Sequence, residues 1–143
     1  MSTPSTARYA AVQLTDVAKD PGPDDDPRAA AFHLVRRHFD IQAFGVNGCA
    51  GDAGQVLVSE HHEADDPENG TQGHEELFAV ISGRATFTID GEDVDAPAGT
   101  LVFVRDPAAL RGARAVEDAT SLLVIGGRPG AAYTVSPWEQ SIP

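Results

Sequence analysis

Residues 74–114 read HEELFAVISGRATFTIDGEDVDAPAGTLVFVRDPAALRGAR, and this stretch decides the fold. Short apolar segments alternate in it with turn residues, at Ser82-Gly83, Asp90-Gly91 and Pro97-Ala98-Gly99. An Asp-Gly pair between two such segments is the signal of a tight β-hairpin. Turns that recur at this spacing favour an all-β barrel or sandwich over alternating strands and helices.

Further strands are predicted on both sides of this block, because short apolar runs recur there between turn residues. Asn47-Gly48 predicts a turn after the first of them, and residues 61–73 form a polar stretch without apolar periodicity, which predicts a loop. We place the core of the barrel at about residues 41–127. The predicted strands are 41–46, 55–59, 77–81, 85–89, 92–96, 101–104, 110–116 and 121–125.

One strand and one helix are predicted within residues 8–39. The alternation over 9–14 favours a short strand, and apolar residues at helical spacing favour an amphipathic helix over 28–39 that begins near Asp26-Pro27. We expect the tail, 128–143, to lie over the outside of a sheet, with Trp138 as a packing anchor.

The composition fits one domain over residues 1–143. A formal charge of −12 disfavours nucleic acids and anionic membranes as partners. No stretch is long and apolar enough to predict a membrane span, and the first eight residues lack the pattern of a signal peptide. We therefore expect a cytoplasmic protein. Cys49 is the one cysteine, and we interpret it as a small buried residue.

The block 74–114 resembles the conserved barrel of the cupin superfamily. Glu76 and Gly83 match the end of the first cupin motif, and Gly99 begins a stretch similar to the second. The resemblance implies an all-β, cupin-like double-stranded β-helix, or jelly-roll barrel, here with one N-terminal α-helix. It also implies a possible homodimer.

Two departures from the cupin motifs concern the metal ligands. Gly70, Thr71 and Gln72 stand where the resemblance implies a histidine pair, and Arg111 stands near the place of the second-motif histidine. An arginine there replaces the charge of an ion with a fixed guanidinium, which could pair with Glu76 or bind an anion. We therefore predict a protein without the usual metal site that binds a polar or acidic small molecule in the barrel mouth. The predicted ligand-binding residues are Arg111, Glu76, His74, Phe78, Phe87 and Phe103.

Two alternatives stay open. His74 and Glu76 are two residues apart, and in an extended chain they share one face with Phe78 and Val80, which we assign to the barrel interior. A displaced metal site of His62, His74 and Glu76 is therefore possible, with His61 as a substitute for His62. Two imidazoles and a carboxylate suit a divalent transition metal such as Zn, Fe, Ni or Mn, and imply a metal-dependent dioxygenase, isomerase or decarboxylase. The other alternative is a non-catalytic structural or interaction module.

Overall fold

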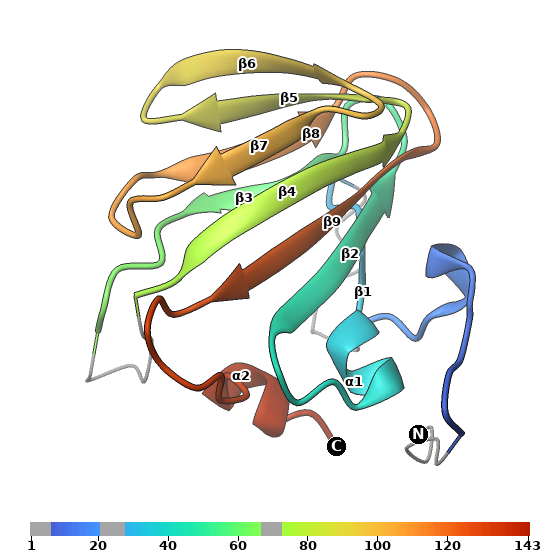
Figure 1. Ribbon diagram of the computed structural model, residues 1–143. Helices are drawn as coiled ribbons and strands as arrows, with labels where there is room; N and C mark the ends of the chain where they lie inside the picture. Colours follow the sequence, from blue (N-terminus) through green and yellow to red (C-terminus); the bar gives the residue numbers. More distant parts are fainter. Residues whose placement is uncertain (1–6, 21–27, 67–72) are drawn as a thin grey trace.

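A computed structural model describes residues 7–20, 28–66 and 73–143. Two antiparallel sheets face each other, which confirms the predicted all-β architecture (Figure 1). The five-stranded sheet has the order β1 (Ala31–His33), β2 (Gly45–Gly51), β9 (Thr120–Gly127), β4 (Glu75–Ser82), β7 (Leu101–Val104). The four-stranded sheet has the order β3 (Val56–His61), β8 (Arg111–Ala115), β5 (Arg84–Ile89), β6 (Glu92–Pro97).

Side chains from the inner faces of both sheets form the main core. Phe78 of β4 meets Phe87 of β5 edge to face, with ring centroids 5.2 Å apart. Both rings are buried, and so are Val80 and Leu122 beside Phe78. Alternation along each strand therefore places Glu76, Phe78 and Val80 on the inner face of β4, as predicted.

Strand register carries this inner face across the five-stranded sheet. Glu76 lies opposite Val104 on one side and Gly126 on the other, and Gly126 lies opposite Gly45. In the next inward row, Phe78 pairs with Val124, which pairs with Asn47. The row that contains Glu76 thus ends in two glycines, which leave space inside the barrel.

The N-terminal segment covers the outer face of the five-stranded sheet. The 3-10 turn η1 (Leu14–Asp16) and the helix α1 (Val35–Phe39) pack a second apolar cluster against Val46 and Ile125. The helix ends at Asp40, whose left-handed backbone (φ 55°) lets its N–H bond to Arg36 and Arg37 carbonyls.

Both N-terminal predictions need correction. No strand forms over 9–14, where Tyr9 is exposed and the segment meets no sheet edge. The predicted helix over 28–39 shrinks to Val35–Phe39, because residues 31–33 instead extend and pair with β2 as an edge strand. Tertiary pairing outweighs local helical spacing in this segment. The expected helix start at Asp26-Pro27 lies outside the described residues.

Asn47-Gly48 is part of β2 and forms no turn, which corrects another prediction. Gly48 pairs with His33 on one side and Leu123 on the other. A Cβ at Gly48 would lie 2.3 Å from a methyl carbon of Leu14. Gly48 therefore allows the Leu14 side chain of η1 to lie directly on the strand, and a larger residue would require that side chain to move.

The tail reaches the inside of the barrel, and this placement corrects the expectation that it covers the outside of a sheet. It ends in the short helix α2 (Pro137–Gln140), beside α1 in Figure 1. Glu139 forms a buried ion pair with Arg36 at 2.5 Å, and the ring of Trp138 meets that of Phe32 edge to face. The predicted anchoring role of Trp138 agrees with this ring contact, although 45% of the residue is exposed.

Among the described residues, no helix has the length and apolar character needed to cross a bilayer.

Candidate functional site

A cavity of about 550 Å³ lies between the sheets. Its wall combines residues of β1, β2, β3, β4 and β9 with residues of the tail. Much of this wall is apolar, including Phe78 and Val124, and volumes of this size are typical of small-molecule sites. Four carboxylates and two imidazoles also line it: Asp20, Glu63, Glu76, Glu139, His61 and His74.

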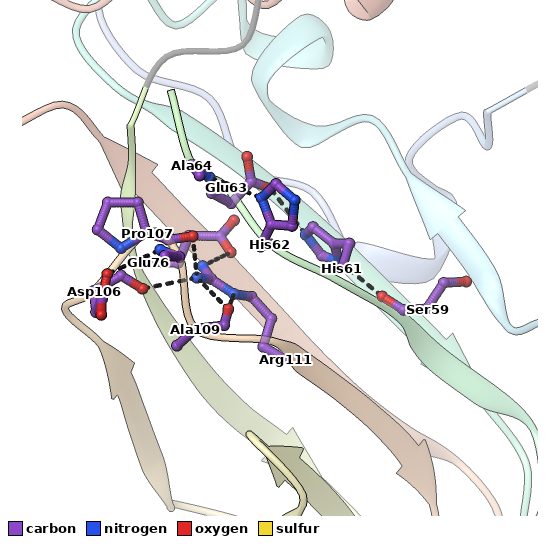
Figure 2. A network of polar contacts seen from close by, with 11 residues as sticks. Ser59, His61, His62, Glu63, Ala64, Glu76, Asp106, Pro107, Ala109 and Arg111 are labelled. Atoms are coloured by element: carbon purple, nitrogen blue, oxygen red, sulfur yellow. Dashed lines mark hydrogen bonds and ion pairs between the residues drawn. The ribbon is translucent and has the colours of Figure 1, made fainter. Parts of the chain in front are cut away.

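Arg111 and Glu76 form a salt bridge between the two sheets. Nη1 of Arg111 donates to Oε1 of Glu76 at 2.8 Å, as predicted from the sequence (Figure 2). The Arg111 side chain is fully buried, and its Nε and Nη2 donate to the carbonyl oxygens of Asp106, Pro107 and Ala109. The guanidinium therefore fixes the loop between β7 and β8 as well as the carboxylate.

Glu76 is the member of this pair that reaches the cavity. Glu76 lines the cavity, whereas Arg111 is not among the described residues that do so. Burial, followed by the charge of Glu63, raises the pKa of Glu76 above its ordinary 4.5, while Arg111 opposes the rise. Glu76 is therefore a partly desolvated carboxylate, and one of its oxygens accepts a hydrogen bond from Arg111.

His61, at the end of β3, lies between two acceptors. Its Nδ1 is 2.7 Å from the Ser59 carbonyl oxygen, and its Nε2 is 2.8 Å from Oε1 of Glu63. Because each ring nitrogen faces an acceptor, the arrangement favours the doubly protonated ring. The hydrogen bond to Glu63 is the main cause that raises the pKa of His61 above 6.5, although burial opposes it.

Glu63 completes this group. Burial raises its pKa, but the hydrogen bond and charge of His61 outweigh that effect and hold the pKa below the ordinary 4.5. His61, Glu63 and Glu76 each offer a ligand atom within 4.8 Å of the others. We call these three residues the His–Glu cluster.

The donor set of the His–Glu cluster fits a divalent metal. One imidazole and two carboxylates are suitable ligands for Zn²⁺ or Mn²⁺. A hydrogen bond from Nδ1 of His61 to the Ser59 carbonyl would leave Nε2 as the coordinating atom, which is the usual outer-shell arrangement of a ligating histidine.

The whole-chain comparison with solved structures identifies this architecture. A cupin protein from Bacteroides fragilis superposes with a TM-score of 0.61 over 91% of this chain and 92% of that chain, at 18% identity. The chain has the cupin fold. A sugar phosphate isomerase of the cupin superfamily from Silicibacter pomeroyi (TM-score 0.62, 15% identity, 83% and 76% covered) and a predicted oxalate decarboxylase from Thermotoga maritima (0.59, 14%, 82% and 97%) are also similar. No family model and no curated protein matches the sequence.

The predicted site residues occupy different parts of this cupin barrel. His74 and Phe78 line the cavity, and the His74 backbone N–H bonds to the Glu63 carbonyl. His62 is exposed, and its Nδ1 accepts a hydrogen bond from the Ala64 backbone (Figure 2). The structure thus brings together His61, the substitute for His62 in the metal hypothesis, with Glu76, and places Glu63 rather than His74 as the third member of the cluster.

Two predicted ligand-binding aromatic residues lie away from the cavity. Phe87 is fully buried in the core. Phe103 is on the outer face of the five-stranded sheet, since its neighbour Val104 faces inward, and Arg105 stacks on its exposed ring. Period-two alternation places Phe103 and Val104 on opposite faces, so a ligand in the cavity contacts neither Phe103 nor its stacked arginine.

Sequence analysis missed several polar residues of the cavity, among them Glu63, Asn47, Tyr133 and Glu139. Glu63 had a detectable signal, because residues two apart in an extended segment share a face and His61 precedes it by two. Asn47 was assigned to a turn. Tyr133 and Glu139 lie in a tail whose local sequence carries no sign that it folds against the barrel interior.

Proposed function

We propose that this cupin barrel binds a small polar molecule in the cavity between its sheets, with the His–Glu cluster as its polar anchor. The observation that carries the proposal is the position of that cluster in the wall of a cavity that is otherwise largely apolar. Apolar walls with a few convergent polar groups are the usual composition of small-molecule sites.

The charges of the cavity favour a neutral or cationic ligand over an acidic one. Among the described residues, four carboxylates line the cavity and neither lysine nor arginine does. The guanidinium of Arg111, which suggested an anion from the sequence, is occupied by Glu76 and three backbone carbonyls. An acidic ligand would be repelled by these carboxylates, because the buried guanidinium of Arg111 does not face the cavity.

Each residue of the cluster has a distinct task in this proposal. Glu63 and Glu76 accept hydrogen bonds from ligand hydroxyl or amine groups. His61, held by Ser59, supplies a proton at Nε2 that ligand and Glu63 share. Arg111 is a positioning residue, because it fixes Glu76 without reaching the cavity.

A cavity-filling variant tests the proposal. Val124 faces the cavity from β9, so Val124→Phe should occupy ligand space, whereas Val94→Phe on an exposed position of β6 is the matched control. We would screen neutral polyols, amines and carboxylic acids by thermal shift and measure the affinity of hits by calorimetry. A ligand at 100 times its Kd stabilises the protein by about 2.7 kcal/mol. Hits should lose affinity in Val124→Phe and keep it in Val94→Phe; equal affinity in both variants would exclude this cavity.

A second function is favoured by the His–Glu cluster itself, namely metal-dependent chemistry. A bound divalent metal would supply Lewis-acid chemistry, with His61, Glu63 and Glu76 as its ligands. Elemental analysis of protein purified without a histidine tag tests this. We expect Glu63→Gln to lose any stoichiometric metal and Glu60→Gln, at an exposed acid near the end of β3, to retain it. Metal retained in Glu63→Gln would place the ion elsewhere.

A further inference from the structure

The cavity has a second polar region, formed where the tail meets β2. Oδ1 of Asn47 and Oε1 of Glu139 are buried, and neither has a hydrogen-bond partner among the described residues. Both residues line the cavity. The Glu139 side chain is only 3% exposed, and a buried acceptor without a donor is unfavourable because it has lost its hydrogen bonds to water. Two acceptors therefore lie unsatisfied beside the same cavity.

The charge of this region is negative. Arg36 is the cation there, and two carboxylates share it: Oε2 of Glu139 lies 2.5 Å from its Nε, and Oδ1 of Asp40 lies 3.9 Å from its Nη1. One guanidinium against two carboxylates leaves an excess negative charge. The nearby Tyr133 responds to it, since burial and then the charge of Glu139 raise the pKa of its phenol, against Arg36.

Two glycines connect this region with the His–Glu cluster. A Cβ at Gly45 would lie 3.1 Å from the ring of Tyr133, and a Cβ at Gly126 would lie 3.4 Å from Cγ of Glu76. Gly45 and Gly126 are paired across β2 and β9, so Tyr133 and Glu76 pack on neighbouring glycines. Both glycines line the cavity, and the two polar regions therefore border the same space.

We propose that the tail region of the cavity is a binding subsite for a primary ammonium group, so that the ligand is a small organic amine. The inference rests on the proposed function and specifies its ligand class. The ammonium group would donate to Oε1 of Glu139 and Oδ1 of Asn47, supplying the donors that both oxygens lack. Its charge would offset the carboxylate charge of the cavity wall, and the remainder of the ligand would extend through the cavity toward Glu76.

Three matched sugars test the subsite: glucosamine, glucose and glucuronate carry an amine, a hydroxyl and a carboxylate on rings of similar size. Each is titrated into the full-length protein, at a pH where the amine is protonated, and followed by NMR shifts of backbone amides. We expect glucosamine to shift the signals of Asn47 and Glu139, and to bind about tenfold more tightly than glucose and more tightly still than glucuronate.

Two variants identify the atoms responsible. Glu139→Gln should abolish the preference for glucosamine over glucose. Because this variant also alters the contact with Arg36, Asn47→Leu provides a second measurement that spares the ion pair, and it should weaken glucosamine selectively. Equal affinity for glucosamine and glucose in the unaltered protein would overturn the amine subsite and leave cavity binding intact. The same conclusion would follow if each variant weakened glucosamine and glucose binding to the same extent. Absence of shifts in every cavity residue with all three sugars would overturn both.

Discussion

The Arg111–Glu76 salt bridge joins the two sheets of the barrel across the edge of the cavity. Arg111 begins β8 in the four-stranded sheet, and Glu76 lies in β4 of the five-stranded sheet, with 2.8 Å between Nη1 and Oε1. The arginine side chain is 0% exposed and the glutamate side chain 12%. Removal of one partner from such a pair leaves an uncompensated charge in a desolvated position.

Arg111→Met should therefore be strongly destabilising. The change leaves Glu76 without its cation and removes the guanidinium hydrogen bonds to the carbonyls of Asp106, Pro107 and Ala109, of which the first two keep a backbone N–H donor. We expect a loss of about 3–5 kcal/mol in the free energy of unfolding, measured by urea denaturation. The double variant Arg111→Met/Glu76→Leu should recover part of this loss, because it removes the stranded charge. A double variant no more stable than the single one would show that the loop carbonyls dominate.

The His61–Glu63 pair predicts a pH dependence in metal-free protein. The raised pKa of His61 contributes stability that is complete below its ordinary 6.5 and is lost as pH rises through the folded value. The lowered pKa of Glu63 contributes stability that is complete above its ordinary 4.5 and is lost as pH falls through the folded value. The stability difference between wild type and Glu63→Gln should thus be largest between pH 4.5 and 6.5.

An NMR titration of the His61 ring provides the direct measurement. Glu63→Gln should bring its pKa down toward 6.5, and Glu60→Gln should leave it unchanged. If the His61 pKa were the same in wild type and Glu63→Gln, the 2.8 Å contact would not persist in solution.

The sequence predicted the strands of the second half of the chain because their turns are specified locally. Asp90 and Gly91, for example, both adopt positive φ angles (48° and 83°), as the expected hairpin requires. Alternation around Phe78 then identified the inner face correctly. The Arg111–Glu76 contact followed from the cupin resemblance together with the need of a buried carboxylate for a cation.

The first half of the chain and the tail were predicted less well because long-range contacts decide their structure. Ala31–His33 has helical spacing around it and becomes a strand through pairing with β2. Gly48 has turn chemistry and sits in a strand because Leu14 packs against it. Glu139 was not predicted as a site residue, because its partner Arg36 is 103 residues away in the sequence. The sequence around either residue gives no sign of this contact.

Cys49 should be chemically inert in the native protein. Its side chain is 1% exposed, and burial, followed by the charge of Glu76, raises the pKa of the thiol to about 12. Because the thiolate is the reactive form, iodoacetamide at neutral pH should label Cys49 very slowly in the folded protein and rapidly in urea. Mass spectrometry after timed quenching checks this, and rapid native labelling would indicate that β2 opens readily.

Two glycines offer a paired test of how the N-terminal segment is placed. Gly48 of β2 and Gly127 of β9 are both strand glycines, and only at Gly48 does a Cβ meet another segment, at 2.3 Å from Leu14; at Gly127 no atom lies within 4 Å. Gly48→Ala should cost about 1 kcal/mol, because the added methyl group meets the flexible end of the Leu14 side chain, which must move to accommodate it. Gly127→Ala should change stability by less than about 0.5 kcal/mol.

The double variant Gly48→Ala/Leu14→Ala should recover part of the loss, because it removes the side chain that the new methyl group meets. Thermal and urea unfolding measure this recovery. If Gly48→Ala were as stable as Gly127→Ala, η1 would not rest on β2, and the cover over the outer face of the five-stranded sheet would have to be assigned to another segment.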